Sequence, residues 1–404
     1  MAKTVRERMS GWISRPDSED DFVANPVELF FDLAFVIAFA QLVSHVVHHP
    51  DVEGVLEAGL LFWMLWLPWT QFTWAANAVS AHSRGVQVVM LLGTVLSVPM
   101  AASVQTALGS NGVLFAGTVS AILGLGLMLL VVGHPTGSAE WKAAVQYGLP
   151  NVGAMVLFLA GAGFDGQSTR IGFWLAGIVV IAVTTIKAGS GDWIVRAGHF
   201  AERHGLILII ALGEVIVAIA LPVLDALSET QGLPAETVGS LMFAGLFSGL
   251  LWWSYFDRPQ KVFEHRMEEL PPGPTARFAR DVYTYLHALI VSGVILAAAA
   301  LEEITLHPLD ELHFEFRVIM LIGLLLFFGA VELAAMRAYH VVPPERAVAM
   351  VVLAILLFAG GSLDGLWLLA IIDAVIVVTL LAESIRLDHP EDTARESTDE
   401  TSAA

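Results

Sequence analysis

Long apolar stretches, separated by short polar segments, recur along the whole chain. A helix rises about 1.5 Å per residue, so about 18 to 25 apolar residues cross a hydrocarbon core of roughly 30 Å. The pattern predicts about twelve such spans, with approximate bounds 26–48, 55–79, 85–107, 112–133, 140–162, 169–187, 200–224, 237–257, 281–301, 314–336, 346–361 and 364–382. The last two flank Gly360 and Gly361, and one re-entrant hairpin is the alternative for that pair. The predicted fold class is an all-α, polytopic transmembrane helix bundle.

Basic residues predict the orientation of this bundle, because short cytoplasmic loops are enriched in Lys and Arg. With the N-terminus inside, only Arg170 and Arg317 of the 20 basic residues fall on the outer side. Losing one span would invert every later loop, so this bias favours an even number of spans with both termini cytoplasmic. Residues 258–280 form the one long cytoplasmic connection in this scheme.

The two halves of the chain resemble each other in the same order of segments. Residues 34–41 (AFVIAFAQ) align with 207–214 (ILIIALGE), and residues 156–166 resemble 356–365. Each half contains about six spans, which predicts a parallel repeat related by an axis along the membrane normal. The alternative is that apolar helices resemble one another generally. Binding sites in repeated membrane proteins lie where the halves meet.

The predicted organisation therefore has two transmembrane halves with polar segments around them. Its parts are a cytoplasmic N-terminal tail (1–25), a first half (26–187), a cytoplasmic connector (188–199), a second half (200–385) and an acidic cytoplasmic tail (386–404). The last segment is rich in acidic residues, Ser and Thr and nearly free of apolar residues, which predicts disorder.

Composition narrows the function classes. The chain of 404 residues is 56% hydrophobic and 15% charged, whereas soluble domains are about 45–50% apolar and about 25% charged. It has no cysteine, which excludes disulfides, thiolate metal sites and cysteine nucleophiles, and a net charge of −19, the wrong sign for a nucleic-acid partner. No P-loop, H-E-x-x-H or dinucleotide fingerprint is present. We expect no cofactor, and membrane lipids and a small solute or ion as partners.

Ionisable residues inside the predicted spans are candidates for proton coupling. Such a side chain costs about 2.5 to 3.5 kcal/mol at the bilayer centre, so it usually serves a function. Glu214 lies twelve residues beyond Glu202, about 18 Å further along the helix. Asp373 lies in the middle of the last span, Gln41 matches Glu214 in the first half, and His287 lies inside the ninth span. The alternative for Glu214 is a protonated carboxyl group that hydrogen-bonds a neighbouring helix.

Polar residues at the cytoplasmic ends of the spans are candidates for a gate. Glu28 and Asp32 are one turn apart and share a helix face. His199 and Glu202 have a spacing compatible with a metal site, but an ion-pair layer with Arg84 or Arg280 explains the same charges, so no metal is predicted. The gate candidates are Glu28, Asp32, His199, Glu202, Arg203, His204 and Asp257.

Aromatic residues have two interpretations. Tryptophans near the membrane surface are usually anchors, but Trp63 and Trp66 lie too deep for that role. Together with Trp253 and Tyr255, they are candidates for lining a substrate cavity, with core packing as the alternative.

Two strings in the chain carry a family resemblance. PVELFFDLAFV (26–36) and HFAERHGLILIIALGE (199–214), with WSYFD (253–257), resemble the bacterial low-temperature-requirement A (LtrA) family of integral membrane proteins over about residues 24–385. The resemblance implies a multi-pass protein of the bacterial inner membrane, associated by name with growth in the cold. It directs attention to the acidic and basic residues of these strings and identifies no substrate.

Three functions remain open at this point. The leading hypothesis is a secondary transporter of unknown substrate, either proton-coupled or not, with Glu214 as the carrier. A membrane-embedded enzyme that modifies a lipid or isoprenoid, using Asp32, Glu202 and His204 in acid–base steps, is the second. The third is a channel or a structural membrane protein involved in cold or stress adaptation.

Overall fold

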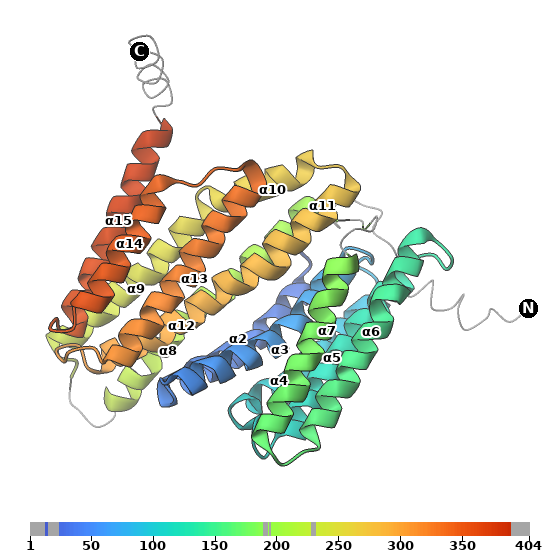
Figure 1. Cartoon of the computed structure of the whole chain (residues 1–404), viewed down its shortest axis with the longest axis horizontal. Helices are drawn as coiled ribbons and strands as arrows, with labels where there is room; N and C mark the ends of the chain where they lie inside the picture. The colour runs from blue at the N-terminus through green and yellow to red at the C-terminus, as the bar shows by residue number, and fades with distance from the viewer. Residues whose placement is uncertain (1–12, 15–23, 189–192, 194, 228–231, 389–404) are drawn as a thin grey trace, which may run out of the picture.

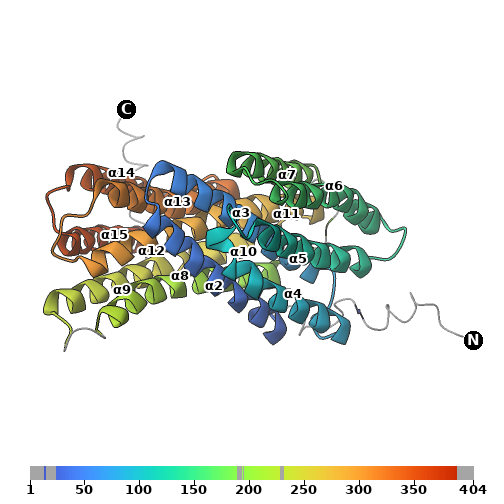
Figure 2. The ribbon, with the colours of Figure 1, turned by 90° about the horizontal axis from the view of Figure 1, so that it is seen from below.

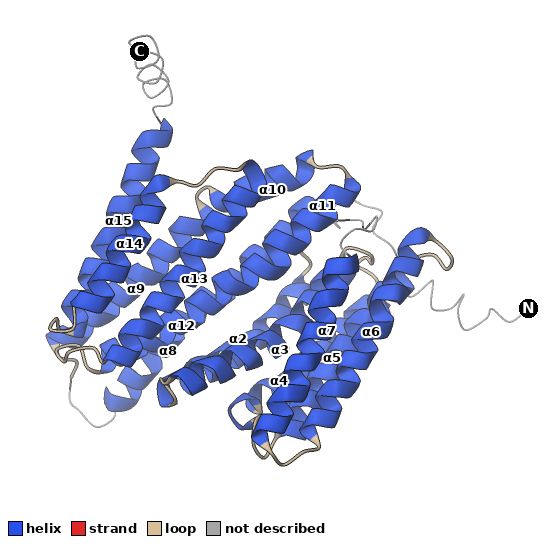
Figure 3. Ribbon diagram, in the orientation of Figure 1, coloured by secondary structure: helices blue, strands red, loops and turns tan. Residues whose placement is uncertain are grey.

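The computed structural model describes residues 13–14, 24–188, 193, 195–227 and 232–388. Within these ranges every regular element is a helix, as Figure 3 shows. The all-α prediction is therefore confirmed for the described chain. Most of the predicted tails, 1–25 and 386–404, and part of the connector lie outside the described residues.

Residues 24–188 form six long helices and one short 3-10 turn. They are α2 (Pro26–His48), α3 (Val52–Ala76), α4 (Arg84–Ala102), η2 (Val104–Thr106), α5 (Gly112–Gly133), α6 (Ala139–Ala162) and α7 (Gln167–Ala188). Local sequence sets their starts. Asn25 caps α2 in a capping box with Glu28, and the Asp51 and Ser138 side chains accept backbone N–H bonds at the starts of α3 and α6.

The chain from residue 197 onward forms α8 (Ala197–Leu227), α9 (Ala235–Phe256), α10 (Pro259–Glu269), α11 (Pro272–Ala279), the π-helix η3 (Arg280–Leu286), α12 (His287–Leu306), α13 (Phe314–Tyr339), α14 (Pro344–Ala359) and α15 (Gly365–Asp388). The predicted connection 258–280 is thus largely helical. Helix α10 extends α9, and α11, η3 and α12 run on as one helix of 35 residues.

Eleven helices among the described residues are long and apolar enough to cross a membrane. They match eleven of the twelve predicted spans. The remaining one, 346–361, corresponds to α14, which has only 16 residues. Side chains such as Val348, Ile355 and Val378 are exposed on the outer faces of α14 and α15, as expected for helices that face lipid.

The helices form two groups that meet at α2. In Figure 1, α3 to α7 lie on one side and α8 to α15 on the other. In the turned view of Figure 2, α9, α14 and α15 lie at the opposite end from α4, α5 and α6, and α10 and α11 overlap the first group. Helix α2 packs on α3 and α4 of its own group and on α8 and α12 of the other.

Small residues allow the closest helix contacts. A Cβ added at Gly293 of α12 would lie 2.6 Å from the carbonyl oxygen of Gly323 on α13. Only glycine permits this approach of two backbones, which is a common way to pack helices without a hydrophobic driving force.

Candidate functional site

A buried ionic network joins α2 to α8. Arg203 donates from Nε and Nη2 to the two carboxylate oxygens of Asp32, at 3.1 and 2.6 Å, and from Nη1 to Glu28 at 2.9 Å. The Trp69 indole donates to Asp32 at 2.8 Å, and the His199 Nε2 atom lies 3.1 Å from Glu28. All five side chains are buried. We call this set the Arg203 cluster.

The Arg203 cluster is held by its local sequence and its charges. The capping box places Glu28 in the first turn of α2, and Asp32 follows one turn later on the same face. A two-point contact between a guanidinium and a carboxylate is among the strongest polar interactions in proteins. Two carboxylates and one guanidinium sum to −1, and a protonated His199 would bring the sum to zero. Removing Arg203 would leave both carboxylates buried without their shared counter-charge.

The carboxylates among the gate candidates do not pair with Arg280, as the ion-pair layer in the sequence analysis would require. Glu28 and Asp32 pair with Arg203, whereas Arg280 donates to Asp281. Glu202, on the next face of α8, accepts from the backbone N–H of Ala24 at 2.7 Å.

Asp257 lies apart from the Arg203 cluster, and of the pair His199 and Glu202 only His199 belongs to it. Asp257 caps α9, is half-exposed and pairs with Arg258. Among the described residues no three His, Asp or Glu side chains come together as metal ligands.

His204 belongs to a second cluster, next to the first. Its ring contacts Trp69 of the Arg203 cluster and lies 5.2 Å from the ring of His287. The rings of Tyr283 and Tyr255 lie 5.7 and 5.2 Å from that of His287. We call His204, Tyr255, Tyr283 and His287 the histidine–tyrosine cluster.

Hydrogen bonds fix the tautomers in the histidine–tyrosine cluster. His204 Nδ1 and His287 Nε2 each lie within bonding distance of a backbone carbonyl, at 2.8 and 3.2 Å, and therefore carry the donated hydrogen. The other ring nitrogens and the hydroxyl groups of Tyr255 and Tyr283 are buried without a hydrogen-bond partner. The histidine–tyrosine cluster therefore contains two unpaired acceptor nitrogens and two unpaired donor hydroxyl groups.

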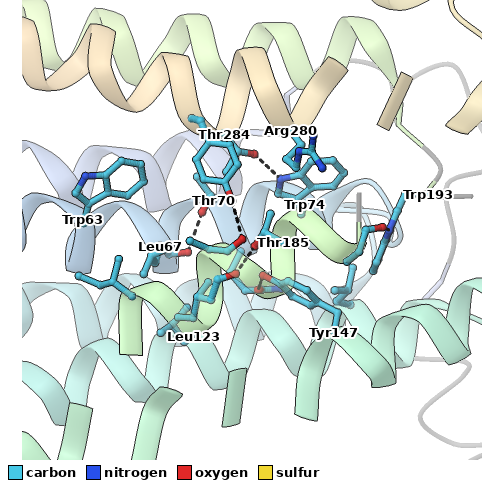
Figure 4. A pocket seen from close by; sticks show the side chains of 17 residues that line it. Trp63, Leu67, Thr70, Trp74, Leu123, Tyr147, Thr185, Trp193, Arg280 and Thr284 are labelled. Carbon is cyan, nitrogen blue, oxygen red and sulfur yellow. Dashed lines mark hydrogen bonds between the residues drawn. The ribbon is translucent and has the colours of Figure 1, made fainter. Parts of the chain in front are cut away.

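A cavity of about 200 Å³ lies between the two groups of helices (Figure 4). Its walls come from α3, α5, α6 and α7, and η3 closes one side. The lining residues are Trp63, Leu67, Thr70, Gln71, Trp74, Leu123, Leu130, Tyr147, Ile178, Ile181, Ala182, Thr185, Ala188, Trp193, Arg280, Thr284 and Tyr285. We call this cavity the α3 pocket. Apolar walls with a few converging polar groups are typical of small-molecule sites.

Polar groups are arranged around the α3 pocket in defined pairs. The Trp74 indole donates to the Thr284 hydroxyl at 2.9 Å, and Tyr147 donates to the Gln71 side-chain oxygen at 3.0 Å. In Figure 4, Thr284 and Arg280 enter from one side and Tyr147 from the opposite side.

The π-helix η3 connects the α3 pocket to the buried clusters. Thr284 lines the pocket, and its carbonyl oxygen accepts from the Trp66 indole at 2.8 Å. The adjacent Tyr283 contacts His204 and His287 on the other side. Short π-helical segments often occur at functional sites, and this one reaches both features.

The deep polar candidates lie away from the α3 pocket. Glu214 and Asp373 are each 2% exposed, and Glu214 Oε2 and both Asp373 oxygens have no hydrogen-bond partner. No hydrogen bond or ion pair joins these two carboxyl groups in the described chain. Gln41 is partly buried on α2. None of the three lines the pocket.

The aromatic candidates separate into different environments. Trp63 lines the α3 pocket, and Trp66 is buried beside it and bonded to Thr284. Tyr255 belongs to the histidine–tyrosine cluster, and Trp253 is 56% exposed on α9. Sequence reasoning missed Tyr147, Thr185, Trp193 and Thr284 as lining residues. No local pattern marks them, because each becomes part of a site only when α6, α7, η3 and the position of Trp193 between α7 and α8 come together.

The fold and its buried polar clusters define a multi-pass α-helical membrane protein. The sequence matches the family model for bacterial low temperature requirement A protein (LtrA) over residues 23–382. The chain therefore belongs to the LtrA family. It is also similar to "Uncharacterized protein RA0937" of Rhizobium meliloti (strain 1021), with 27% identity over 337 residues, covering 81% of this chain and 80% of the relative. No solved structure matches the chain significantly.

Proposed function

We propose that this LtrA protein is a secondary transporter of the bacterial inner membrane whose substrate binds in the α3 pocket. The observation that carries the proposal is the position of this pocket between α3, α5, α6 and α7 of the first half and η3 of the second. Carriers bind their substrates where two halves of the transmembrane domain meet. The pocket size and lining favour a small, mainly apolar solute with one hydrogen-bonding group.

Helix packing supports the parallel repeat on which this proposal depends. In the first half α2 packs on α4, α4 on α5, and α6 on α7; in the second, α8 packs on α12, α12 on α13, and α14 on α15. These are the pairs that a six-span repeat would place in equivalent positions. Both termini would then lie on the cytoplasmic side.

The Arg203 cluster is suited to act as the gate between the halves. It is the main ionic connection from α2 to α8, and it lies where both helices begin. Opening this end would separate Arg203 from Glu28 and Asp32, which requires that the charges be neutralised or rehydrated. A proton taken up by a carboxyl group would ease that separation, so we include proton coupling in the proposal.

Glu214 and Asp373 remain the candidates for carrying the proton within the bundle. Each is a buried carboxyl group with an unpartnered oxygen. Glu214 lies on α8, the helix that also bears Arg203. Movement of α8 during opening would therefore change the surroundings of Glu214 and Arg203 together.

The test is solute uptake into proteoliposomes, with indole, phenol and benzoate as probes and a pH-sensitive dye inside. Ala182→Phe fills the α3 pocket, whereas Val183→Phe places the same phenyl ring on the outer, exposed face of α7. We expect wild type and Val183→Phe to take up a probe faster than protein-free liposomes, which such solutes also enter passively, and Ala182→Phe to lose most of this excess. Uptake that is equal in all three proteins would place the substrate elsewhere, and probe conversion without uptake would favour an enzyme.

A further inference from the structure

A second pocket, of about 280 Å³, lies at the outer edge of the second group of helices, where α9 ends and α10 begins. Helix α15 forms its opposite wall, and Arg346 of α14 closes its inner side. We call it the α9/α15 pocket. It is separate from the α3 pocket, and it shares no lining residue with it.

The charges that line the α9/α15 pocket balance. Asp257 pairs with Arg258 at 3.3 Å, and Arg346 pairs with Glu383 at 2.8 Å. Two positive and two negative side chains therefore line one small space. Such a lining offers no surplus positive charge to a purely anionic ligand, but it can pair with both ends of a zwitterion.

The inner side of this pocket is a built polar site. Arg346 is 3% exposed, and it donates to the Ser254 carbonyl oxygen at 3.1 Å as well as to Glu383. The carboxyl group of Glu332 lies 3.6 Å from Arg346, and both of its oxygens are buried without a hydrogen-bond partner. Since Glu332 and Glu383 both lie beside Arg346, this side of the pocket has no surplus positive charge.

The rest of the α9/α15 pocket is apolar and opens toward the predicted lipid. Leu250, Val377 and Leu380 line it, and Leu381 is 58% exposed at its edge. Trp253, also exposed, lies beside the charged residues at the end of α9. Tryptophan next to charged groups marks the level of the lipid headgroups. The pocket thus has a polar end at headgroup level and an apolar wall along the acyl chains.

We propose that the α9/α15 pocket binds one phospholipid whose headgroup carries both a phosphate and a primary ammonium group, as in phosphatidylethanolamine. The phosphate accepts hydrogen bonds from Arg258 at the rim. The ammonium group donates to the carboxylates of Asp257 and Glu383, and the acyl chains lie against α9 and α15. This site does not depend on the transporter proposal.

The experiment is native mass spectrometry of the purified full chain, exchanged into nanodiscs that contain equal amounts of phosphatidylethanolamine, phosphatidylglycerol and phosphatidylcholine. We expect one phosphatidylethanolamine to remain bound to wild type after release from the nanodisc. Asp257→Asn and Arg258→Gln should each lower its retention about tenfold, because each removes one charge-assisted contact. Both side chains lie at the end of α9. Asp257 is 47% exposed and Arg258 is 32% exposed, so the variants should fold.

Arg266→Gln is the matched control, because Arg266 forms a similar exposed pair with Glu269 on α10, away from the pocket. It should retain the lipid as wild type does. Retention of phosphatidylglycerol equal to or above that of phosphatidylethanolamine would overturn the proposal, as would unchanged retention in Asp257→Asn and Arg258→Gln. Phosphatidylcholine retained equally well would overturn the role of the ammonium hydrogens, since its headgroup has no N–H donor.

Discussion

At the scale of single residues, Arg203 is the one cation that binds both carboxylates of the Arg203 cluster. It pairs with Glu28 and Asp32 and lies beside the ring of Trp69. Replacing it with an uncharged side chain would leave two carboxylates buried together. Removing one partner of a buried ion pair costs about 3–5 kcal/mol.

We therefore expect Arg203→Met to lower the free energy of unfolding by about 3–5 kcal/mol, measured by denaturant titration in detergent micelles. Arg266→Gln removes an exposed pair with Glu269 and should cost less than about 1 kcal/mol. Equal losses in the two variants would show that the Arg203 cluster contributes no more than a surface pair.

Removing the hydroxyl groups of Tyr255 and Tyr147 should have opposite effects on the stability of the protein. The Tyr255 hydroxyl is buried without a hydrogen-bond partner, whereas the Tyr147 hydroxyl donates to Gln71. Tyr255→Phe should leave stability unchanged or raise it by up to about 1 kcal/mol, and Tyr147→Phe should lower it by about 1 kcal/mol. Thermal unfolding in the same detergent compares them. A clear loss in Tyr255→Phe would indicate that an ordered water satisfies this hydroxyl.

Some of these contacts could be predicted from the sequence and others could not. The four-residue spacing of Glu28 and Asp32 places them on one face, and both do bind Arg203. Their partner was not predictable, because it comes from a helix more than 160 residues away. Nor does any local pattern show that Trp69 contacts the Arg203 cluster or that Thr284 lines the α3 pocket.

At the scale of elements, hydropathy predicted most spans because each is a continuous apolar run. It did not predict α10 and α11, where polar residues interrupt the pattern, nor that η3, at the start of the predicted span 281–301, is π-helical. Their helical form depends on packing, since buried residues such as Phe263, Phe278 and Tyr283 hold them against neighbouring helices. The secondary structure of these three segments therefore depends on tertiary packing and cannot be predicted from hydropathy.

The contact of α12 with α13 supplies a test at this scale. Gly293→Ala would bring a Cβ to 2.6 Å from the Gly323 carbonyl oxygen, so the helices must separate. We expect a loss of about 1–3 kcal/mol in the free energy of unfolding. Gly329→Ala, on α13 with open space around it, should raise stability by up to about 1 kcal/mol. If both variants had the same stability, the close approach of α12 and α13 at Gly293 would not contribute to the stability of the protein.

At the scale of the whole molecule, the distribution of basic residues predicts both termini inside. The loop after α4 should then lie outside and the loop after α5 inside. The chain has no cysteine, so single introduced thiols can be labelled without background. Ser110 and Thr136 are exposed positions in these two loops.

We expect Ser110→Cys to react with a membrane-impermeant maleimide in intact cells, once any outer barrier is permeable to the reagent. Thr136→Cys should react only after the inner membrane is opened. The opposite result at both positions would invert the orientation, and labelling of both in intact cells would contradict an odd number of crossings between them.

The Arg203 cluster also has a consequence for how the chain is made. Glu28 and Asp32 bind Arg203, which lies 175 and 171 positions later in the sequence. At about 5 to 20 residues per second, synthesis takes roughly 9 to 35 seconds to reach that arginine. During this interval the carboxylates of α2 lack the counter-charge of Arg203. We therefore expect the first turn of α2 to stay in the aqueous or headgroup layer, or beside the insertion machinery, until α8, the seventh spanning helix, emerges.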